Sequence, residues 1–551
     1  MDGRMGTGNA VKIRGATIRY TLLSFTPSIF ILIVIVAPFI DLALSFGSLN
    51  FYKIMTGSSP IAMLSRRALY NSLIQGGVSA VFSLLLGYPL GVFLGRNNFR
   101  FKKLIVSLVI LPFFLPSLVV VYAFMSGFGQ GSPASILFSG FTMLSRGFVG
   151  IIAVNTFFNA PLVALYTMSS LSTEKSSQIE AVMSLGASDV GGFFTVFGKD
   201  TLLAALGGAT LAFAYSFAGF AAPLIIGGPG AYTLDAWIYF MFRILGNFHA
   251  SVSLAIFEAI SLIVPTIIYV RILSTQRREG SVESRINTAP SRRSVLFLSA
   301  FAYMVAWLII EAYLLSSVVL RALRANSTFS ATNFLILFSN RTTSATGISA
   351  LGSILNSLFY GFVVSIVVVA AGMAWIAGRK MLHKRYLGTA EVFHFIPLVI
   401  SSLLMAFAIL IVYGINTPQQ FLWILIVSAQ IAVAIPVVMR TIDAGFSPIS
   451  REFLESSLTL GGHPFLDVEI PLAKVSFYIS LMFGFAISLG EFTATNFLAT
   501  PKFFSLPVEI YSLQLSRLFG PSFAAATVLL FLSLLVFVLI QRMGEKFIGV
   551  R

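Results

Sequence analysis

The chain has 551 residues, of which 57% are hydrophobic and only 10% are charged, and its formal net charge is +16. Soluble domains are about 45–50% apolar and about 25% charged, so this composition excludes an ordinary soluble enzyme and a disordered protein. A chain that cannot cover itself with polar surface is predicted to cross a lipid bilayer many times. The absence of Cys excludes disulfides, thiolate metal sites and cysteine nucleophiles.

Stretches of about 20 apolar residues mark helices that cross the hydrocarbon core, and the sequence predicts twelve of them. The first lies near 22–46 and follows a basic segment that includes Arg14 and Arg19. Its uncharged run is longer than the apolar core of a signal peptide, so we expect it to be retained. The other predicted spans lie near 70–95, 103–126, 148–170, 202–224, 250–272, 295–320, 352–378, 391–414, 421–441, 473–496 and 521–541.

The distribution of positive charge predicts the orientation of these spans. Lys and Arg collect in cytoplasmic loops. With the N-terminus placed inside, most of the 36 basic residues fall in the inner segments. An even number of spans then puts the C-terminus on the cytoplasmic side as well. A net positive charge can indicate binding to nucleic acid. Because basic cytoplasmic loops explain the positive charge of this chain, we expect it to contact lipid and not nucleic acid.

A polar linker at 274–294 divides the chain almost in half and predicts two repeats, 1–273 and 295–551. The sequence offset between matching residues is constant within blocks of spans and changes only in loops. Two six-span repeats of this kind have parallel topology. The matching pairs include Asn71 with Asn356, Ser72 with Ser357, Gly87 with Gly372, Glu180 with Glu455, Leu185 with Leu460, Gly186 with Gly461 and Leu234 with Leu506.

The most specific pattern lies in the inner loops after the fourth and tenth spans, at about 172–192 and 447–467. In each loop a Glu precedes a Gly by six positions, as Glu180 precedes Gly186 and Glu455 precedes Gly461. Polar residues before each Glu suit the start of a helix, and the Gly permits a sharp turn. Each loop is therefore predicted to hold a short helix suited to docking in a groove of another protein.

These loops resemble the EAA signature of the membrane subunits of type I ABC importers, in which the loop docks on the ATP-hydrolysing subunit. The resemblance extends over nearly the whole chain to the fused twelve-span permeases of thiamine and ferric-iron importers. The segments 71–73 and 87–90 carry it, and 217–229 and 488–507 look more like the thiamine member. It implies an all-α type I ABC importer permease fold. It also implies that coupling to the ATPase involves Glu180, Ala181, Gly186, Glu455, Ser456 and Gly461.

The resemblance further implies the partners and the location of the chain. The sequence lacks a G-x-x-x-x-G-K-[ST] phosphate loop, so we expect a transport subunit, not an enzyme, with no cofactor of its own. ATP and Mg would bind two copies of a separate ATPase subunit, and an extracytoplasmic binding protein would deliver the solute. The chain would lie in the cytoplasmic membrane. Thiamine or its phosphates are the favoured solute, and ferric iron or another small ion is the alternative.

The candidate residues for the substrate pathway include one acidic residue. A carboxylate in the eleventh span, Glu491, is costly at membrane depth and therefore a candidate for function. With aromatic neighbours it would attract a cation, and the alternative is a structural hydrogen bond between helices. Tyr122, Phe158, Asn159 and Tyr215 are further candidates, against the alternative that they face lipid or the core.

Two other classes of membrane protein are alternatives to the importer. A secondary transporter of two six-span repeats would need charge relays within its spans and no partner ATPase. A membrane sensor would normally carry a soluble domain, and no loop here is long enough to form one. The matched Glu and Gly in the two inner loops favour the importer.

Overall fold

The structure is a computed structural model that describes residues 23–547, apart from 47–52, 55, 98, 172–181, 183, 187–188, 278–294, 326–327, 380–392, 395, 398–399, 415 and 447–448. Apart from turns and loops, the described part consists of helices and one antiparallel pair, β1 (Arg324–Ala325) and β2 (Thr328–Phe329). The fold is therefore all-α, as the sequence predicts.

Within the described residues, nine helices are long and apolar enough to cross a membrane, and each coincides with a predicted span. A tenth predicted span, 103–126, corresponds to two helices joined at a bend. The remaining two predicted spans coincide with the shorter apolar segments Thr26–Leu42 and Ser402–Gly414. The chain is a multi-pass membrane protein, and the twelve predicted spans all have helical counterparts.

The prediction of one uninterrupted span at 103–126 is wrong. The segment forms α6 (Lys102–Phe114) and α7 (Ser117–Phe128), and the bend between Lys102–Phe114 and the apolar stretch Ser117–Leu137 is 97°. The cause is Pro116, which has no backbone N–H and keeps the preceding residue out of the helical region. Leu115 accordingly has φ −75° and ψ 148°, which is extended.

Two other predicted spans end earlier than expected. The helix in 202–224 is α11 (Asp189–Phe217), and the helix in 473–496 is α22 (Ile470–Gly490). In the second case Glu491 takes an extended conformation. Its carboxylate then accepts backbone hydrogen bonds from the start of the next short helix, which separates the two helices.

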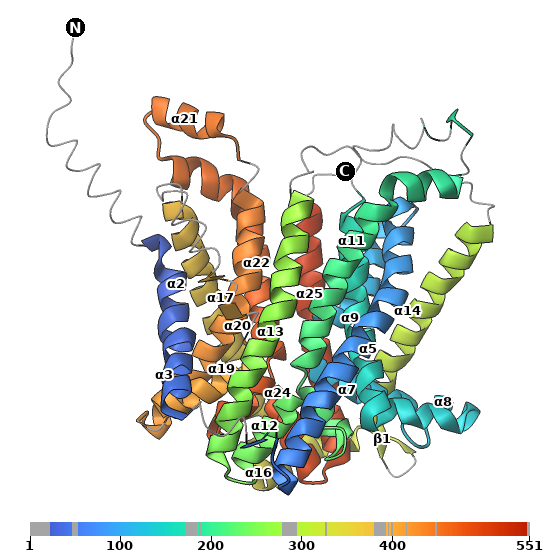
Figure 1. Ribbon diagram of the computed structural model, residues 1–551, viewed down its shortest axis with the longest axis vertical. Helices are drawn as coiled ribbons and strands as arrows, with labels where there is room; N and C mark the ends of the chain where they lie inside the picture. The colour runs from blue at the N-terminus through green and yellow to red at the C-terminus, as the bar shows by residue number, and fades with distance from the viewer. Residues whose placement is uncertain are drawn as a thin grey trace, which may run out of the picture. The chain divides into compact units, whose positions relative to one another are not determined.

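The helices form two compact units. Unit 1 is built from the described parts of Met1–Ser45, Thr342–Glu509 and Phe531–Arg551. Its main elements are α2 (Thr26–Ile31), η1 (Leu32–Val36), α3 (Ala37–Phe46), α17 (Ala350–Arg379), α19 (Ser402–Ile409), η5 (Leu410–Gly414), η6 (Gln419–Phe421), α20 (Leu422–Phe446), α21 (Arg451–Thr459), η7 (Pro464–Glu469), α22, α23 (Thr493–Leu498) and η8 (Pro501–Phe503). The helices α17, α20 and α22 pack on one another, and α2 packs on α17 (Figure 1).

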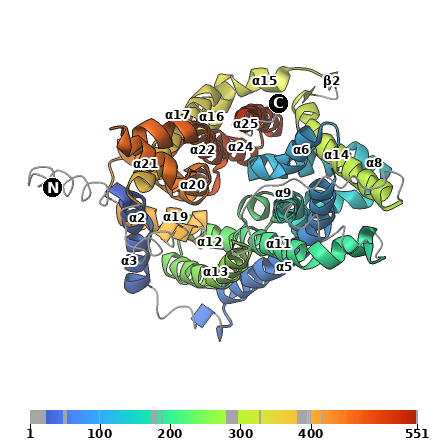
Figure 2. The same cartoon turned by 90° about the horizontal axis from the view of Figure 1, so that it is seen from above.

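Unit 2 is built from Phe46–Arg341 and Ile510–Leu530. Besides α6, α7, α11 and the two strands, its elements are α5 (Pro60–Arg96), α8 (Pro133–Leu137), η2 (Ser139–Ser145), α9 (Gly147–Ser169), η4 (Pro223–Gly227), α12 (Leu234–Arg243), α13 (Phe248–Arg277), α14 (Val295–Ala322) and α15 (Thr332–Leu337). The helices α16 (Asn340–Thr346), α24 (Leu506–Leu515) and α25 (Phe519–Phe547) contribute to both units. In unit 2, α5, α9 and α11 lie side by side, as Figure 2 shows.

The units do not follow the two sequence halves. Unit 1 includes α2, η1 and α3 from the first half, and unit 2 includes α14 from the second half, which packs on α7. The repeat boundaries 1–273 and 295–551 concern similarity along the sequence, and they remain a prediction.

Matching residues of the two halves nevertheless make matching contacts. In unit 2, the Asn71 side-chain amide donates to the carbonyl oxygens of Gly230 and Tyr232 at 3.2 and 3.0 Å. In unit 1, the Asn356 amide donates to the carbonyl oxygens of Lys502 and Phe504 at 3.1 and 3.0 Å. Each Asn therefore ties a long helix, α5 or α17, to the loop that leads into α12 or α24.

The serine that follows each of these asparagines also makes the same contact in both halves. The Ser72 hydroxyl accepts the backbone N–H of Leu234 at 2.8 Å, and the Ser357 hydroxyl accepts that of Leu506 at 2.7 Å. Because Leu234 and Leu506 begin α12 and α24, each serine supplies a hydrogen-bond partner that the helix start otherwise lacks.

Candidate coupling site and pathway residues

The first candidate site is α21, which lies between α20 and α22 in unit 1. Figure 1 shows α21 running across the long axes of α17 and α22, beyond their ends. Glu455 and Ser456 are exposed on it, as the prediction of a docking surface requires. Phe453 is also 61% exposed. A helix with exposed apolar and acidic side chains offers a surface for another protein.

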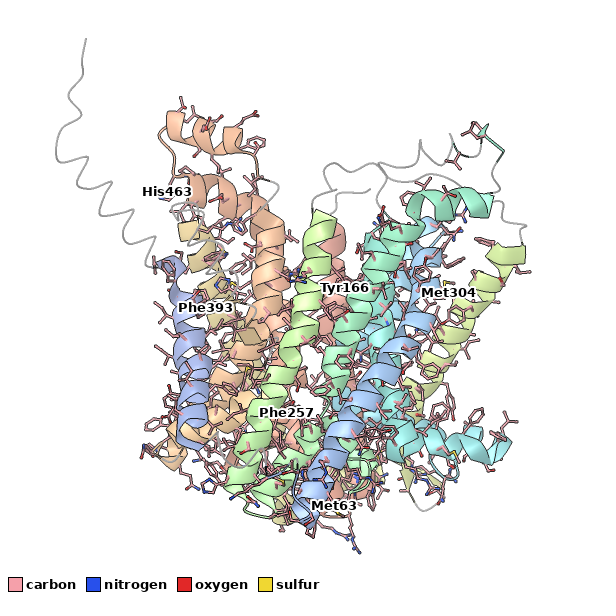
Figure 3. All side chains as sticks on the ribbon, in the orientation of Figure 1. Met63, Tyr166, Phe257, Met304, Phe393 and His463 are labelled. Atoms are coloured by element: carbon pink, nitrogen blue, oxygen red, sulfur yellow. The ribbon has the colours of Figure 1, made fainter. Side chains whose placement is uncertain are left out.

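A tight turn ends α21. Gly461 has φ +77°, in the left-handed region, and the N–H of Gly462 donates to the carbonyl oxygen of Ser457 at 2.8 Å. This is the Schellman arrangement, which satisfies a carbonyl at the helix end. His463 follows at the turn (Figure 3), and its N–H donates to the Asp467 carboxylate in η7. The turn therefore fixes the path from α21 through η7 into α22.

The corresponding loop of unit 2 is described only in part. Glu180 and Ala181 lie outside the described residues. Gly186 has φ +94°, so it shares the left-handed conformation of Gly461. A Cβ built on either glycine would meet no atom within 4 Å. The glycine is thus required by the backbone conformation and not by a lack of space.

Sequence reasoning did not single out the exposed residue before each glycine. Leu185 is 88% exposed and Leu460 is 87% exposed. A leucine exposed to this extent at the tip of a loop loses hydrophobic free energy unless a partner covers it. The repeat pairs the two leucines, so their shared position directly before the glycine was the available signal.

Basic side chains lie at the same end of each unit as these loops. In unit 1, Arg379 at the last turn of α17 forms an ion pair with Asp443 of α20. In unit 2, a Cβ on Gly95 would contact Leu171, which follows α9, so Arg96 lies where α9 enters its loop. Two of the basic residues that the sequence assigns to the inner face, Arg96 and Arg379, therefore lie beside the candidate coupling loops.

Among the pathway candidates, Glu491 has a complete set of local partners. Its Oε1 accepts the N–H of Ala494 at 2.8 Å. Its Oε2 accepts the N–H and the hydroxyl of Thr495 at 2.9 and 2.8 Å. These bonds cap the start of α23 and account for the burial of the carboxylate without a solute. Its role in a pathway stays a prediction.

Tyr122 is likewise held by the chain itself. It is only 1% exposed, and its hydroxyl donates to Gln514 Oε1 at 2.7 Å and pairs with the Ser522 hydroxyl. The ring packs edge-on against Phe523 with centroids 5.0 Å apart. These contacts fasten α7 to residues near the start of α25 within unit 2.

Phe158 and Tyr215 are more accessible. Phe158 is half-buried on α9, and Tyr215 is 38% exposed on α11. Asn159 is buried, and its amide donates to the Ser216 hydroxyl at 3.2 Å. The structure thus brings Phe158, Asn159 and Tyr215 to one region of unit 2, while Tyr122 lies in another set of contacts. Their part in transport also stays a prediction.

Comparison with protein families shows which kind of protein has a sequence similar to the segment that contains α9 and α11. Residues 87–279 match the family model of the binding-protein-dependent transport system inner membrane component. Over these residues the chain is similar to this permease family. By its description, that family consists of membrane transport components. The match covers α9, the described part of the first candidate coupling loop and α11.

Individual permeases extend the similarity to other parts of this chain. The thiamine transport system permease protein ThiP of Haemophilus influenzae is 25% identical over 79% of this chain and 81% of its own length. The molybdate/tungstate transport system permease protein WtpB of Pyrococcus abyssi is 29% identical over 38% of this chain and 78% of its own length. The spermidine/putrescine permease PotB of Haemophilus influenzae is 24% identical over 36% of this chain and 73% of its own length. The latter two thus align with only one part of this permease.

Proposed function

We propose that this permease forms the translocation pathway of an ABC importer for thiamine or its phosphates. The observation that carries the proposal is the matched pair of loops, in which an exposed leucine precedes a left-handed glycine in both units. Two equivalent docking surfaces suit two copies of one ATPase subunit. The similarity to the thiamine permease over most of both chains supports the choice of solute.

The remaining assignments follow from this arrangement. The loops and the basic side chains beside them would face the cytoplasm, together with both termini. The chain would lie in the cytoplasmic membrane, and an extracytoplasmic binding protein would deliver the solute to the opposite side. ATP and Mg would bind the ATPase subunits, and the permease would hold no cofactor.

Coupling would operate through the rigid path from α21 into α22. When ATP closes the ATPase pair, a partner seated on Leu460 would move α21. The Schellman turn at Gly461 and the hydrogen bond between His463 and Asp467 would transmit that movement to η7 and α22. ATP then favours one of two membrane conformations because the ATPase binds that conformation more tightly.

The proposal is tested with the complete complex of permease, ATPase and binding protein in proteoliposomes. ATP-dependent accumulation of radiolabelled thiamine is the expected result. Glu455→Ala should reduce both ATPase association and uptake. Glu452→Ala, which removes the same charge earlier on α21, is the matched control and should retain both activities.

Other outcomes would point elsewhere. If thiamine is not taken up but ferric iron is, the importer assignment stands and the solute changes. If uptake follows an ion gradient without any ATPase, the chain is a secondary transporter and the coupling assignment is wrong.

A further inference from the structure

Three aromatic side chains from three spans meet in unit 2. The ring of Phe113, near the end of α6, lies with its centroid 5.6 Å from that of Phe158 on α9. It lies 6.3 Å from the ring of Tyr215 on α11. Phe113 and Phe158 are half-buried and Tyr215 is exposed. We refer to these three residues as the aromatic cluster.

Tyr215, the member of the aromatic cluster on α11, does not lie on the side of that helix that suits contact with lipid. Leu202 and Leu206 on that helix are 47% and 41% exposed, and aliphatic side chains of this kind are typical of contact with acyl chains. An α-helix turns by about 100° per residue, so Tyr215, nine positions after Leu206, lies on the opposite side of α11. The helix therefore has two accessible sides, and Tyr215 is on the one away from the exposed leucines.

Polar side chains hold the helices beneath the aromatic cluster. Asn155, one turn before Phe158 on α9, donates from Nδ2 to Gln75 Oε1 on α5 at 2.7 Å. Asn159 donates from Nδ2 to the hydroxyl of Ser216 on α11. Amide groups at membrane depth are costly unless they are paired, so these bonds fix the three helices with respect to one another.

One polar atom beside the aromatic cluster lacks a protein partner. Asn159 is 1% exposed, and its Oδ1 has no hydrogen-bond partner among the described residues. A buried acceptor left unpaired costs free energy, and a donor group on a bound solute would satisfy it. Asn159 directly follows Phe158 in the sequence, so this acceptor belongs to the same part of α9.

The fold does not require aromatic residues at these positions. In the sequence repeat, Phe113, Phe158 and Tyr215 correspond to Leu398, Val433 and Ile487. The second half of the sequence therefore carries aliphatic residues at all three matching positions. Aromatic residues occur at these positions in the first half only, which indicates a role beyond packing.

We infer that Phe113, Phe158 and Tyr215 form a stacking site for a flat, cationic aromatic ring of the solute, with Asn159 Oδ1 as the acceptor for an amino group on a second ring of the same solute. The inference rests on the proposed function, because thiamine joins a cationic thiazolium ring to an aminopyrimidine ring. Aromatic faces attract cations and stack on flat rings.

The test measures thiamine uptake and ATP hydrolysis together in the complete complex. Phe158→Ala and Tyr215→Ala should each lower the amount of thiamine taken up per ATP hydrolysed by about tenfold, which corresponds to about 1.4 kcal/mol. Tyr215→Phe should retain the wild-type ratio because it keeps the ring. Val433→Ala and Ile487→Ala are the matched controls from the other half and should leave the ratio unchanged.

The absence of Cys from the chain permits a second measurement. A water-soluble thiol reagent should label Tyr215→Cys but not Leu206→Cys, and thiamine should slow the labelling during turnover. If the wild-type complex fails to transport thiamine, the proposed solute is wrong. If it transports thiamine while Phe158→Ala and Tyr215→Ala keep the wild-type ratio, or if Leu206→Cys is labelled and Tyr215→Cys is not, the stacking site is wrong and the proposed function stands.

Discussion

Replacing Gly461 by Ala should weaken the docking of the ATPase without disturbing the packing of the spans. Gly461 has φ +77°, and a Cβ at this position would meet nothing within 4 Å. The added methyl group therefore creates no clash, and the cost is confined to the backbone. A non-glycine residue in the left-handed conformation costs about 1–2 kcal/mol, so the equilibrium constant for forming the native turn should fall by a factor of about 5–30.

The affinity of the ATPase for the permease should fall by up to the same factor, because only the fraction with the native turn binds. The measurement is the dissociation constant of the ATPase on the permease in nanodiscs. Gly461→Asn should lose less affinity, since Asn tolerates the left-handed conformation better than Ala.

The matched control for this substitution is Gly77→Ala on α5. A Cβ there also meets nothing within 4 Å, but φ is not positive, so Ala should be neutral or stabilise the helix. If Gly461→Ala binds the ATPase as tightly as the wild type, the turn does not shape the docking surface and the argument from its geometry is refuted.

Three further predictions concern hydrogen bonds and protonation. Asn71→Ala and Asn356→Ala each remove two hydrogen bonds to loop carbonyl oxygens and should each destabilise the protein by about 1–3 kcal/mol; equal midpoints of thermal unfolding in detergent for variant and wild type would contradict this. Glu491→Ala removes the cap of α23 and should cost about 1–2 kcal/mol, whereas loss of uptake without a change in the unfolding midpoint would instead indicate a pathway role. Burial raises the pKa of Glu509, in the segment between the last two spans, to about 7, and the hydrogen bond from Thr346 opposes the shift. Because this pKa is higher in the folded than in the unfolded state, its stabilisation is complete below about pH 4.5 and is lost as the pH rises through about 7. Glu509→Gln should flatten the dependence of the unfolding midpoint on pH over that range, and identical slopes for the two proteins would show that this carboxyl group is not responsible.

The helices were predictable because a bilayer demands long apolar segments, and hydropathy alone locates them. The bend at Leu115 and Pro116 was missed because a proline within an apolar run signals a break or only a kink, and the packing around it decides between the two. The end of α22 at Gly490 was missed for a related reason. Glu491 ends the helix by capping α23, and its three hydrogen bonds are a matter of geometry that composition does not reveal.

Apolar periodicity could not predict which helices pack together in each of the two units. Periodicity shows that 295–320 is a helix, but not that α14 packs on α7 in unit 2. For the same reason, the contacts of Tyr122 with Gln514 and Ser522 had no signal in the sequence. The glycines of the coupling loops were predictable, since a turn after a short helix calls for the left-handed conformation, and Gly186 and Gly461 adopt it.

The accessibility of Leu185 and Leu460 tests the central claim most directly. In a chain without native Cys, Leu185→Cys and Leu460→Cys are single labelling sites. A membrane-impermeant maleimide should label both only from the cytoplasmic side of oriented vesicles, and the ATPase subunit should protect both. Labelling from the outer side, or equal labelling with and without the ATPase, would contradict the account.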